Sequence, residues 1–203
     1  MNNLPKTGGQ LLVEALELHG AERVFCVPGE SYLAVLDALY DADIPVTVCR
    51  QEGGAAMMAD TYGKLTGKPG VIVGQGGFTG STGMFGVIEA FLASSPMLVL
   101  TELSDHNEFV THGPIQSGAG HYGSFDLAGI YRSSTKYTAV AHTAREAVMT
   151  TQLAYKHAIT GRPGPTACLF RANTLRDPVA NNGLPEIHNT KRLLNVSKSV
   201  PAQ

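Results

Sequence analysis

The sequence lacks the features that would place it in a membrane or on a nucleic acid. No apolar run in its 203 residues approaches the roughly 20 residues that a membrane-spanning helix needs. The opening Met-Asn-Asn-Leu-Pro-Lys contains no apolar signal core. Its 15 lysines and arginines nearly balance its 17 aspartates and glutamates, which gives a net charge of −2. A chain with so little net charge carries no electrostatic footprint for nucleic acid or acidic lipid, so neither partner is expected.

Cysteine is also scarce, and no two cysteines have the CxxC spacing of a metal or redox motif. Cys26, Cys49 and Cys168 each fall in or beside an apolar run. Cysteines of this kind are typical of free, buried thiols in a reducing compartment. We therefore expect a cytoplasmic protein with free thiols and no metal ligands of its own.

Six short apolar runs alternate with segments of helical periodicity. The runs predict strands at 24–27, 46–49, 71–74, 97–101, 137–140 and 166–170. Because each run is continuously apolar, both faces of the sheet are expected to be covered, which is typical of parallel strands. The predicted fold class is therefore α/β, a six-stranded parallel sheet with helices on both faces. Right-handed crossovers then bring the strand-to-helix loops to one edge of the sheet.

Start and stop signals bound several of the predicted elements. Ser31 is expected to cap the second helix, and Gly67 is expected to close the third. Beyond Arg171 the chain turns polar and loses its apolar period. We therefore predict one domain over 1–178, followed by a tail or linker over 179–203.

Glu52 stands where the second predicted strand ends and a helix begins. In an open α/β sheet this is the carboxyl edge, where ligands bind. The next four residues are glycine and alanine, which leave room for a ligand close to the backbone. The alternative is structural, because the helix dipole favours an acid in the first turn and small residues favour helix–sheet packing. Asp60, on the same helix, is expected to be exposed.

The glycine-rich stretch 74–83 matches other ligand-binding motifs only in part. Gly74-x-Gly76 follows a strand, as a dinucleotide fingerprint does, but Thr79 occupies the place of the third glycine. The sequence contains no GxxxxGK[ST] phosphate loop and no GxSxG nucleophile elbow. Nicotinamide binding is therefore a weak alternative, and hydrolase chemistry has no support.

A long segment, 102–124, interrupts the alternating pattern, and loops of this length are usually functional or mobile. His106, His112 and His121 lie in it without the spacing of a standard metal site. We expect Gln116, with His112 or His121, at the carboxyl edge beside a substrate pocket. The alternative is a surface excursion without a role.

Several stretches, taken together, are typical of one family. They are Phe25-Cys26-Val27-Pro28-Gly29-Glu30-Ser31, the run 49–59 from Cys49 through Glu52, and Tyr62-Gly63-Lys64-Leu65-Thr66-Gly67 with its continuation to Gly70. Ser94-Ser95-Pro96, Ser134-Thr135-Lys136 and Gly161-Arg162-Pro163-Gly164-Pro165 continue the pattern. Over about residues 8–178 the chain resembles the N-terminal pyrimidine-binding domain of thiamine-diphosphate enzymes, in the acetolactate synthase-like branch.

The resemblance implies a catalytic role for Glu52. In the family, the matching acid hydrogen-bonds a ring nitrogen of the aminopyrimidine, and an acid can share a proton in this way only where water is excluded. The residues expected to bind the pyrimidine half of thiamine diphosphate are Glu52, Pro28, Gly29, Gly77 and Thr82. The residues expected around a small 2-keto acid are Glu30, Phe78, His112 and Gln116.

The chain departs from the family pattern in two respects. The family's Gly-Pro-Gly loop appears here as Gly77-Phe78-Thr79, and Thr82 stands where the family has Asn. The sequence also contains no Gly-Asp-Gly, which in the family holds the diphosphate through a divalent metal. We therefore expect Mg²⁺ to be held only by a partner domain, and we do not expect FAD.

The resemblance predicts part of a thiamine-diphosphate-dependent 2-keto acid decarboxylase or carboligase. Such a chain would need a separate diphosphate-binding (PP) subunit and would work as a homo- or hetero-oligomer. Two alternatives stay open. One is a truncated, inactive synthase fragment, and the other is a non-catalytic regulatory or binding subunit with the same fold.

Overall fold

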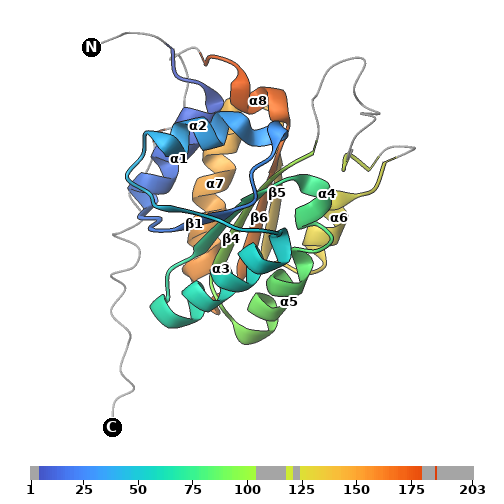
Figure 1. The fold of residues 1–203 in the computed structure, drawn as a ribbon. Helices are drawn as coiled ribbons and strands as arrows, with labels where there is room; N and C mark the ends of the chain where they lie inside the picture. The colour runs from blue at the N-terminus through green and yellow to red at the C-terminus, as the bar shows by residue number, and fades with distance from the viewer. Residues whose placement is uncertain (1–4, 104–117, 121–123, 180–185, 187–203) are drawn as a thin grey trace.

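The computed structural model describes residues 5–103, 118–120, 124–179 and 186, and a parallel sheet lies at its centre (Figure 1). The strands are β1 (Val24–Cys26), β2 (Val46–Val48), β3 (Gly70–Gly74), β4 (Met97–Glu102), β5 (Tyr137–Ala141) and β6 (Pro165–Phe170). Their order across the sheet is β2-β1-β3-β4-β6-β5, and all neighbours run parallel. Each strand overlaps the apolar run that predicted it, so the predicted fold class is confirmed.

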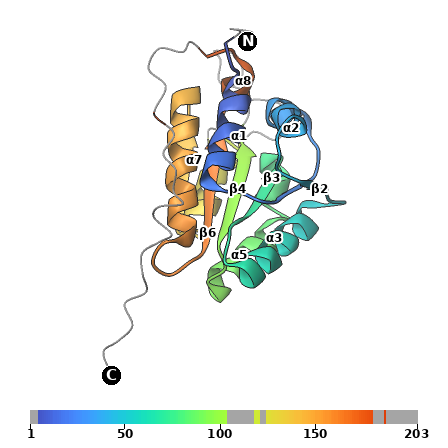
Figure 2. The same cartoon turned by 90° about the vertical axis from the view of Figure 1, so that its left-hand side faces the viewer.

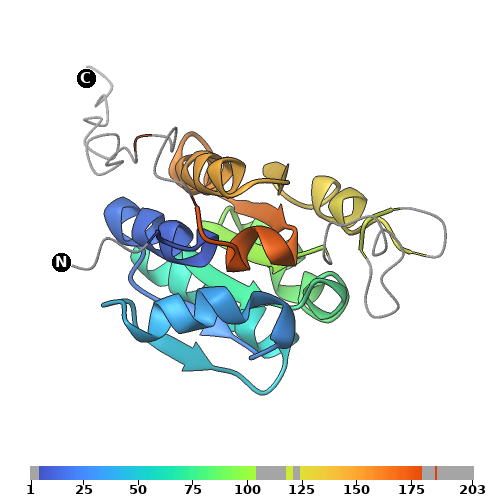
Figure 3. The same cartoon turned by 90° about the horizontal axis from the view of Figure 1, so that it is seen from above.

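Helices cover the sheet on both faces (Figure 2). One face carries α1 (Gly8–His19), α2 (Leu33–Tyr40), α7 (Ala144–Ile159) and α8 (Ala172–Arg176). The other carries α3 (Glu52–Thr66), α5 (Met84–Ala93) and α6 (Leu127–Arg132), with the short α4 (Gly76–Thr79) between β3 and α5. Seen from above, α1 (dark blue), α2 (light blue) and α8 (red) lie in front of the sheet (Figure 3).

The central strand β4 explains why the apolar runs are continuous. Leu98 and Leu100 belong to the core under α1, α2 and α7, whereas Met97 and Val99 belong to the core under α3, α5 and α6. Successive side chains of a strand point to opposite faces, and here both faces are buried. All four side chains are therefore apolar, and none is more than 2% exposed.

Sequence signals fix the ends of α1 and α3. The Thr7 hydroxyl accepts a hydrogen bond from the Gln10 amide, and the Gln10 side chain accepts one from the Thr7 amide, which completes a capping box. The third helix ends at Gly67, as predicted, and its φ of 70° is in the left-handed region that glycine tolerates. The chain therefore leaves α3 directly toward β3.

The prediction that Ser31 caps α2 was wrong. A 3-10 turn, Glu30–Tyr32, precedes α2, and the Ser31 hydroxyl instead accepts a hydrogen bond from Gln75 Nε2 at 3.2 Å. The Ser31 hydroxyl is therefore bound by the loop after β3 and does not cap the amides of α2. A contact between residues 44 positions apart leaves no trace in the local sequence.

The apolar run of the second strand predicted that both of its faces are buried, but β2 is largely exposed. β2 forms one edge of the sheet, and Val46 and Val48 are 37% and 67% exposed. Its apolar composition matches that of the central strands. Burial here depends on strand order, which the local sequence does not reveal.

Asp60 was expected to be exposed, and this was wrong. Its side chain is 1% exposed, and its Oδ2 lies 2.7 Å from Nζ of Lys64. Helical spacing places Asp60 on the same inner face of α3 as Ala56 and Gly63, because they lie four residues before it and three after it.

The polar segment beyond Arg171 was expected to belong to a tail, but it forms α8 and buries Ala172 and Leu175. The Val179 amide then donates a hydrogen bond to the Lys6 carbonyl at 2.8 Å. Residues 180–185 and 187–203 lie outside the described part of the chain, so the boundary at 178 stays a prediction.

Candidate active site

A topological switch point lies between β1 and β3. After β1 the chain moves to β2, whereas after β3 it moves in the opposite direction, to β4. Right-handed crossovers therefore place α2 and α5 on opposite faces of the sheet, and the loops after β1 and β3 diverge. Ligands of open α/β sheets bind at such a point. The candidate site consists of the segments after β1 and β3 together with the start of α3.

Glu52 is the first residue of α3 and is only 9% exposed. Gln51 before it has an extended backbone, with φ −158° and ψ 161°, so the chain turns into the helix at this carboxylate. The neighbouring strand passes close by, since a Cβ on Gly74 would lie 3.6 Å from Cγ of Glu52. Glu52 is therefore a buried acid at the positive end of a 15-residue helix.

The Glu52 carboxylate has no hydrogen-bond partner among the residues that the structure describes. It also makes no side-chain cap of its own helix, because α3 has no side-chain cap hydrogen bond. The residue as a whole is only 9% exposed, so little of it faces water. Its carboxylate oxygens are therefore free to accept a hydrogen bond from a ligand at this edge of the sheet.

The glycine-rich stretch after β3 forms the short helix α4, although its residues carry no helix signal. Thr79 ties it to β4, because its Oγ1 lies 2.8 Å from Oγ1 of Thr101. Thr101 Oγ1 in turn donates to the Gly74 carbonyl at 2.7 Å. A Cβ on Gly76 would lie 2.1 Å from the Glu102 carbonyl oxygen, so this close approach requires glycine. Tertiary contacts, rather than helix propensity, therefore hold α4.

Gly77, Phe78 and Thr82 border the start of α3 from the β3 side. The Thr82 carbonyl oxygen would lie 3.1 Å from a Cβ on Gly53. The Thr82 hydroxyl donates to the Phe78 carbonyl at 3.1 Å and closes the turn after α4, which leaves its oxygen lone pairs for a ligand. The Phe78 ring is 44% exposed.

The loop after β1 approaches the site from the other side. A Cβ on Gly29 would lie 2.7 Å from Cγ of Gln75, so the loops after β1 and β3 touch. Pro28 and Glu30, on either side of Gly29, are exposed. The structure therefore brings both loops to one edge, as the topology predicted. Gln75, which joins them, was not among the predicted site residues.

Two buried groups near Glu52 were missed. Tyr32 is 3% exposed, and its hydroxyl donates to the Val27 carbonyl. Burial, and then the electrostatic influence of Cys26, Glu52 and Glu102, raises the pKa of Tyr32 well above its usual value. Tyr32 was not predicted for the site because its place in an amphipathic segment is that of an ordinary core residue.

Glu102 is the second group; its place at the end of a strand had suggested a ribose-binding acid in the nicotinamide alternative, and it was not among the residues predicted for this site. It is 3% exposed, and its Oε1 accepts a hydrogen bond from the Gly76 amide at 3.3 Å. A sequence signal was available, because an apolar strand that ends in an acid places that acid at the carboxyl edge. The site therefore holds two buried carboxyl groups instead of one.

His112 and Gln116, predicted for the substrate pocket, and His121 lie outside the described residues, so their roles stay predictions. Within the described ranges, no three His, Cys, Asp or Glu side chains gather in a group that could hold a metal ion. No helix in those ranges is long and apolar enough to cross a membrane.

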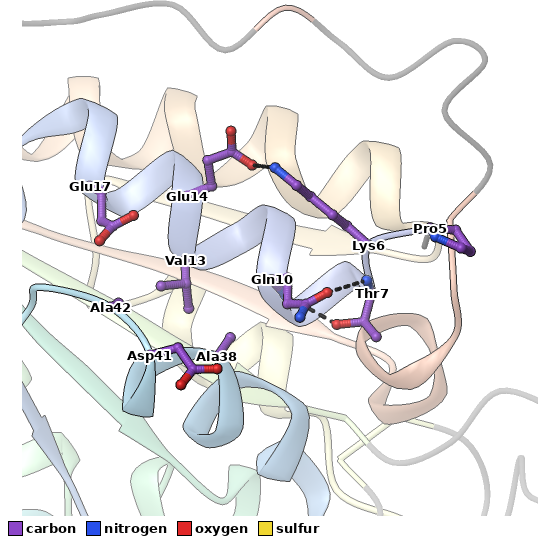
Figure 4. Close-up of a pocket in the computed structure, with 10 residues that line it drawn as sticks. All are labelled: Pro5, Lys6, Thr7, Gln10, Val13, Glu14, Glu17, Ala38, Asp41 and Ala42. Atoms are coloured by element: carbon purple, nitrogen blue, oxygen red, sulfur yellow. Dashed lines mark hydrogen bonds and ion pairs between the residues drawn. The ribbon is translucent and has the colours of Figure 1, made fainter. Parts of the chain in front are cut away.

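A separate groove lies between α1 and α2 (Figure 4). Its lining residues are Pro5, Lys6, Thr7, Gln10, Val13, Glu14, Glu17, Ala38, Asp41 and Ala42. Lys6 forms an ion pair with Glu14 at 2.5 Å, and Glu17 accepts a hydrogen bond from the Asp43 amide at 3.1 Å. None of the predicted site residues lines this groove.

The fold and the site define a class: a doubly wound α/β domain with a buried acid at its switch point. A family model described as "Thiamine pyrophosphate enzyme, N-terminal TPP binding domain" matches residues 6–120. The match includes both loops of the candidate site and Glu52. The chain belongs to this family, which confirms the resemblance inferred from its motifs.

Individual relatives are acetolactate synthase chains. The chain is 32% identical over 161 residues to acetolactate synthase isozyme 2 large subunit of Escherichia coli (78% of this chain, 27% of that one). It is 30% identical over 196 residues to acetolactate synthase large subunit of Lactococcus lactis (93% and 32%). The mitochondrial acetolactate synthase catalytic subunit of Saccharomyces cerevisiae is 31% identical over 163 residues (78% and 22%). The chain thus spans between a fifth and a third of the length of these relatives.

Proposed function

We propose that this chain supplies the pyrimidine-binding half of a thiamine-diphosphate-dependent 2-keto acid decarboxylase or carboligase of the acetolactate synthase-like kind. The observation that carries the proposal is Glu52, a carboxylate 9% exposed at the start of α3 without a hydrogen-bond partner among the described residues. Family membership and the named relatives support the cofactor and the reaction class.

The residues around Glu52 suit an aminopyrimidine ring. Glu52 offers a hydrogen-bond acceptor that nothing in the described chain uses. Gly53 and Gly74 remove side-chain bulk on two sides of it, and the exposed Phe78 offers an apolar ring. An acid in such a setting can hold a proton at a ring nitrogen and fix the orientation of the ring.

Each group has a separate task in this proposal. When bound, thiamine diphosphate supplies the electron sink that allows a 2-keto acid to lose carbon dioxide. Glu52 holds the proton at the pyrimidine ring nitrogen. Pro28, Gly29, Gly77 and Thr82 bind the pyrimidine half of the cofactor. Glu30 and Phe78, with His112 and Gln116, surround the 2-keto acid.

The proposal includes a separate diphosphate-binding subunit. In the family, a diphosphate-binding (PP) domain holds the diphosphate through a divalent metal. In this proposal a PP subunit holds Mg²⁺ and the diphosphate, in a cytoplasmic homo- or hetero-oligomer, and family membership supports this. The site is completed only where the two subunits meet.

The test compares two carboxylates that both lie in the first turn of a helix. Glu52→Gln is nearly isosteric but cannot supply the shared acidic proton. With the diphosphate-binding subunit present, it should slow exchange of the cofactor's thiazolium proton, measured by NMR, by about 100-fold or more. Decarboxylation of a panel of small 2-keto acids should fall in parallel.

Glu146→Gln is the matched control. Glu146 lies in the first turn of α7, where it accepts a hydrogen bond from the His142 amide at 2.7 Å. Glu146→Gln should lower the free energy of unfolding by about 0.3–1 kcal/mol and leave the rate of thiazolium proton exchange unchanged. If Glu52→Gln exchanges as fast as wild type in the complex, Glu52 is structural.

One observation favours the non-catalytic alternative, a regulatory or binding subunit. The Thr82 hydroxyl uses its proton within its own turn, and Phe78 replaces the proline of the family's Gly-Pro-Gly loop. In that case the wild-type complex would bind the cofactor but show no accelerated proton exchange. A synthase fragment, by contrast, would bind no diphosphate-binding subunit.

A further inference from the structure

The groove between α1 and α2 has an apolar floor, formed by Val13, Ala38 and Ala42, and it continues into a second hollow (Figure 4). The second hollow is lined by Thr7, Gln10, Leu33, Ala34, Leu36, Asp37, Tyr40 and Arg176. Because Thr7 and Gln10 line both hollows, we treat the two as one surface, the α1/α2 surface. Their volumes, about 800 and 660 Å³, are those of sites that accept a drug-sized ligand, so several large side chains fit.

The rim of the α1/α2 surface is acidic. Its lining residues carry four carboxylates and two cations, which gives a net charge of −2; they are Glu14, Glu17, Asp37 and Asp41 against Lys6 and Arg176. Lys6 is already paired with Glu14 at 2.5 Å. A surface of this sign repels nucleic acid and acidic lipid and attracts a basic chain. The acidic rim and the apolar floor together fit a basic segment that also carries large apolar side chains.

The segment 187–203 of the same chain has this chemistry. Its sequence contains Lys191, Arg192 and Lys198 and no aspartate or glutamate, so its side chains carry a net charge of +3 with histidine neutral. Leu193 and Leu194 follow the basic pair directly. The segment therefore combines positive charge with apolar bulk, as the α1/α2 surface combines negative charge with an apolar floor.

The described part of the chain brings this segment close to the surface. Gln152 Nε2 of α7 donates a hydrogen bond to the Glu186 carbonyl at 3.5 Å, so residue 186 lies against α7. On the same face of the sheet α7 packs beside α1, and α1 beside α2 (Figure 2). With packed helices about 8–10 Å apart, the groove lies roughly 15 Å from α7. Five residues of extended chain span about 16 Å, so Lys191 and the residues after it are within reach of the groove.

We propose that segment 187–203 docks on the α1/α2 surface of its own chain. Lys191 and Arg192 lie against the acidic rim, and Leu193 and Leu194 occupy the apolar floor. A short tether gives the segment an effective concentration of about 1 mM, so a dissociation constant of about 0.1–1 mM is enough to keep at least half of the molecules docked. The inference goes beyond the proposed function and uses none of the residues of the candidate active site.

The test uses one fluorescent reporter in the full chain. The sequence contains no tryptophan, so Leu193→Trp introduces a single indole into the segment. In the folded protein its emission should lie at shorter wavelength than in the same protein unfolded in urea, because docking removes the indole from water. Raising the salt concentration from about 0.1 to about 1 M should weaken this shift, since the Debye length falls from about 10 to about 3 Å. Dilution should leave the shift unchanged, because the segment and the surface belong to one chain.

Asp41→Lys, added to the reporter chain, should lower the docked population about threefold or more and move the emission to longer wavelength. Asp41 is exposed at the end of α2, where lysine suits the helix dipole, so circular dichroism should show a folded protein. Glu89→Lys is the matched control. It makes the same change of charge on α5, on the opposite face of the sheet, and should leave the emission unchanged.

Three outcomes would overturn the proposal. The first is an emission maximum that is the same in the folded and the unfolded reporter chain. The second is an equal effect of Asp41→Lys and Glu89→Lys. The third is a shift that disappears on dilution, which would assign the α1/α2 surface to the segment of a second copy. A shift that Asp41→Lys alone reduces, at every protein concentration, would support docking within one chain.

Discussion

Gly74 and Thr79 approach each other so closely that no side chain fits between them: a Cβ on Gly74 would lie 2.6 Å from Cγ2 of Thr79. Thr79 is held in place by its contact with Thr101 at 2.8 Å. Gly74→Ala should therefore lower the free energy of unfolding by about 1–3 kcal/mol, as overpacking does. Urea denaturation measures the loss. The same Cβ would lie 3.6 Å from Cγ of Glu52, an ordinary contact, so Glu52 should keep its place.

Gly54→Ala is the control for this substitution and should act in the opposite direction. Gly54 lies inside α3, and no atom lies within 4 Å of the position its Cβ would occupy. Alanine is more favourable than glycine inside a helix by about 0.5–1 kcal/mol. A destabilising Gly54→Ala, or a neutral Gly74→Ala, would contradict this account of the two glycines.

Asp60 and Glu89 share Lys64 but differ in burial, which predicts different costs. Asp60 is 1% exposed, and replacing it by Asn leaves a buried amide where a charged pair was, at a cost of about 1–3 kcal/mol. Glu89→Gln removes an exposed partner of the same lysine and should cost less than about 1 kcal/mol. If thermal or urea unfolding showed equal losses of stability for Asp60→Asn and Glu89→Gln, burial would not explain the difference between the two carboxylates.

Cys168 predicts a loss of stability at alkaline pH. Complete burial raises the pKa of this thiol from 9.0 to about 12. Above pH 9 the unfolded chain releases this proton while the folded chain keeps it, so the free energy of unfolding falls. The contribution is fully present below pH 9 and is lost at about 1.4 kcal/mol per pH unit. Cys168→Ala should flatten the slope above pH 9 and leave it unchanged below; an unchanged slope above pH 9 would argue against the shift.

Arg162 closes the end of α5. Its Nε donates to the Ser94 hydroxyl at 2.6 Å, and its Nη2 donates to the Phe91 and Leu92 carbonyls at 3.3 and 3.2 Å. Arg162→Ala should lower the free energy of unfolding, measured by urea denaturation, by about 1–3 kcal/mol, because hydrogen bonds from a charged group are lost at a helix C-terminus. Arg162→Lys should recover only part, since an ammonium group cannot reproduce the guanidinium geometry. Arg132→Ala, on the surface of α6, should stay within about 0.5 kcal/mol of wild type.

The strands could be predicted because each core strand is apolar on both sides, as the alternation of Met97, Leu98 and Val99 between the two cores shows. The exposure of Val48 could not be predicted, because it arises from the position of β2 at one edge of the sheet, and the local sequence does not reveal strand order. Asp60 was predictable in principle from helical spacing. The α4 helix was not, because contacts of Thr79 with another strand outweigh the poor helix propensity of glycine.

The candidate site was predictable in outline for the same reasons. The position of Glu52 followed from the alternation of strand and helix, and the structure places it at the switch point. Its contact with Gly74, and the nearby Tyr32 and Glu102, arise from strands brought together by the crossovers. Such side-chain contacts depend on register, which a single sequence does not display.

The loops at the amino ends of the strands are fixed differently from the loops at the carboxyl ends, where Glu52 lies. At the edge opposite Glu52, Lys136 donates to the His157 and Thr160 carbonyls at the end of α7, and Arg162 does the same for α5. These cations anchor helix ends to loops and touch no predicted site residue. Changes in the loops after β1 and β3 can therefore leave untouched the contacts of Lys136 and Arg162 that hold the scaffold presenting those loops.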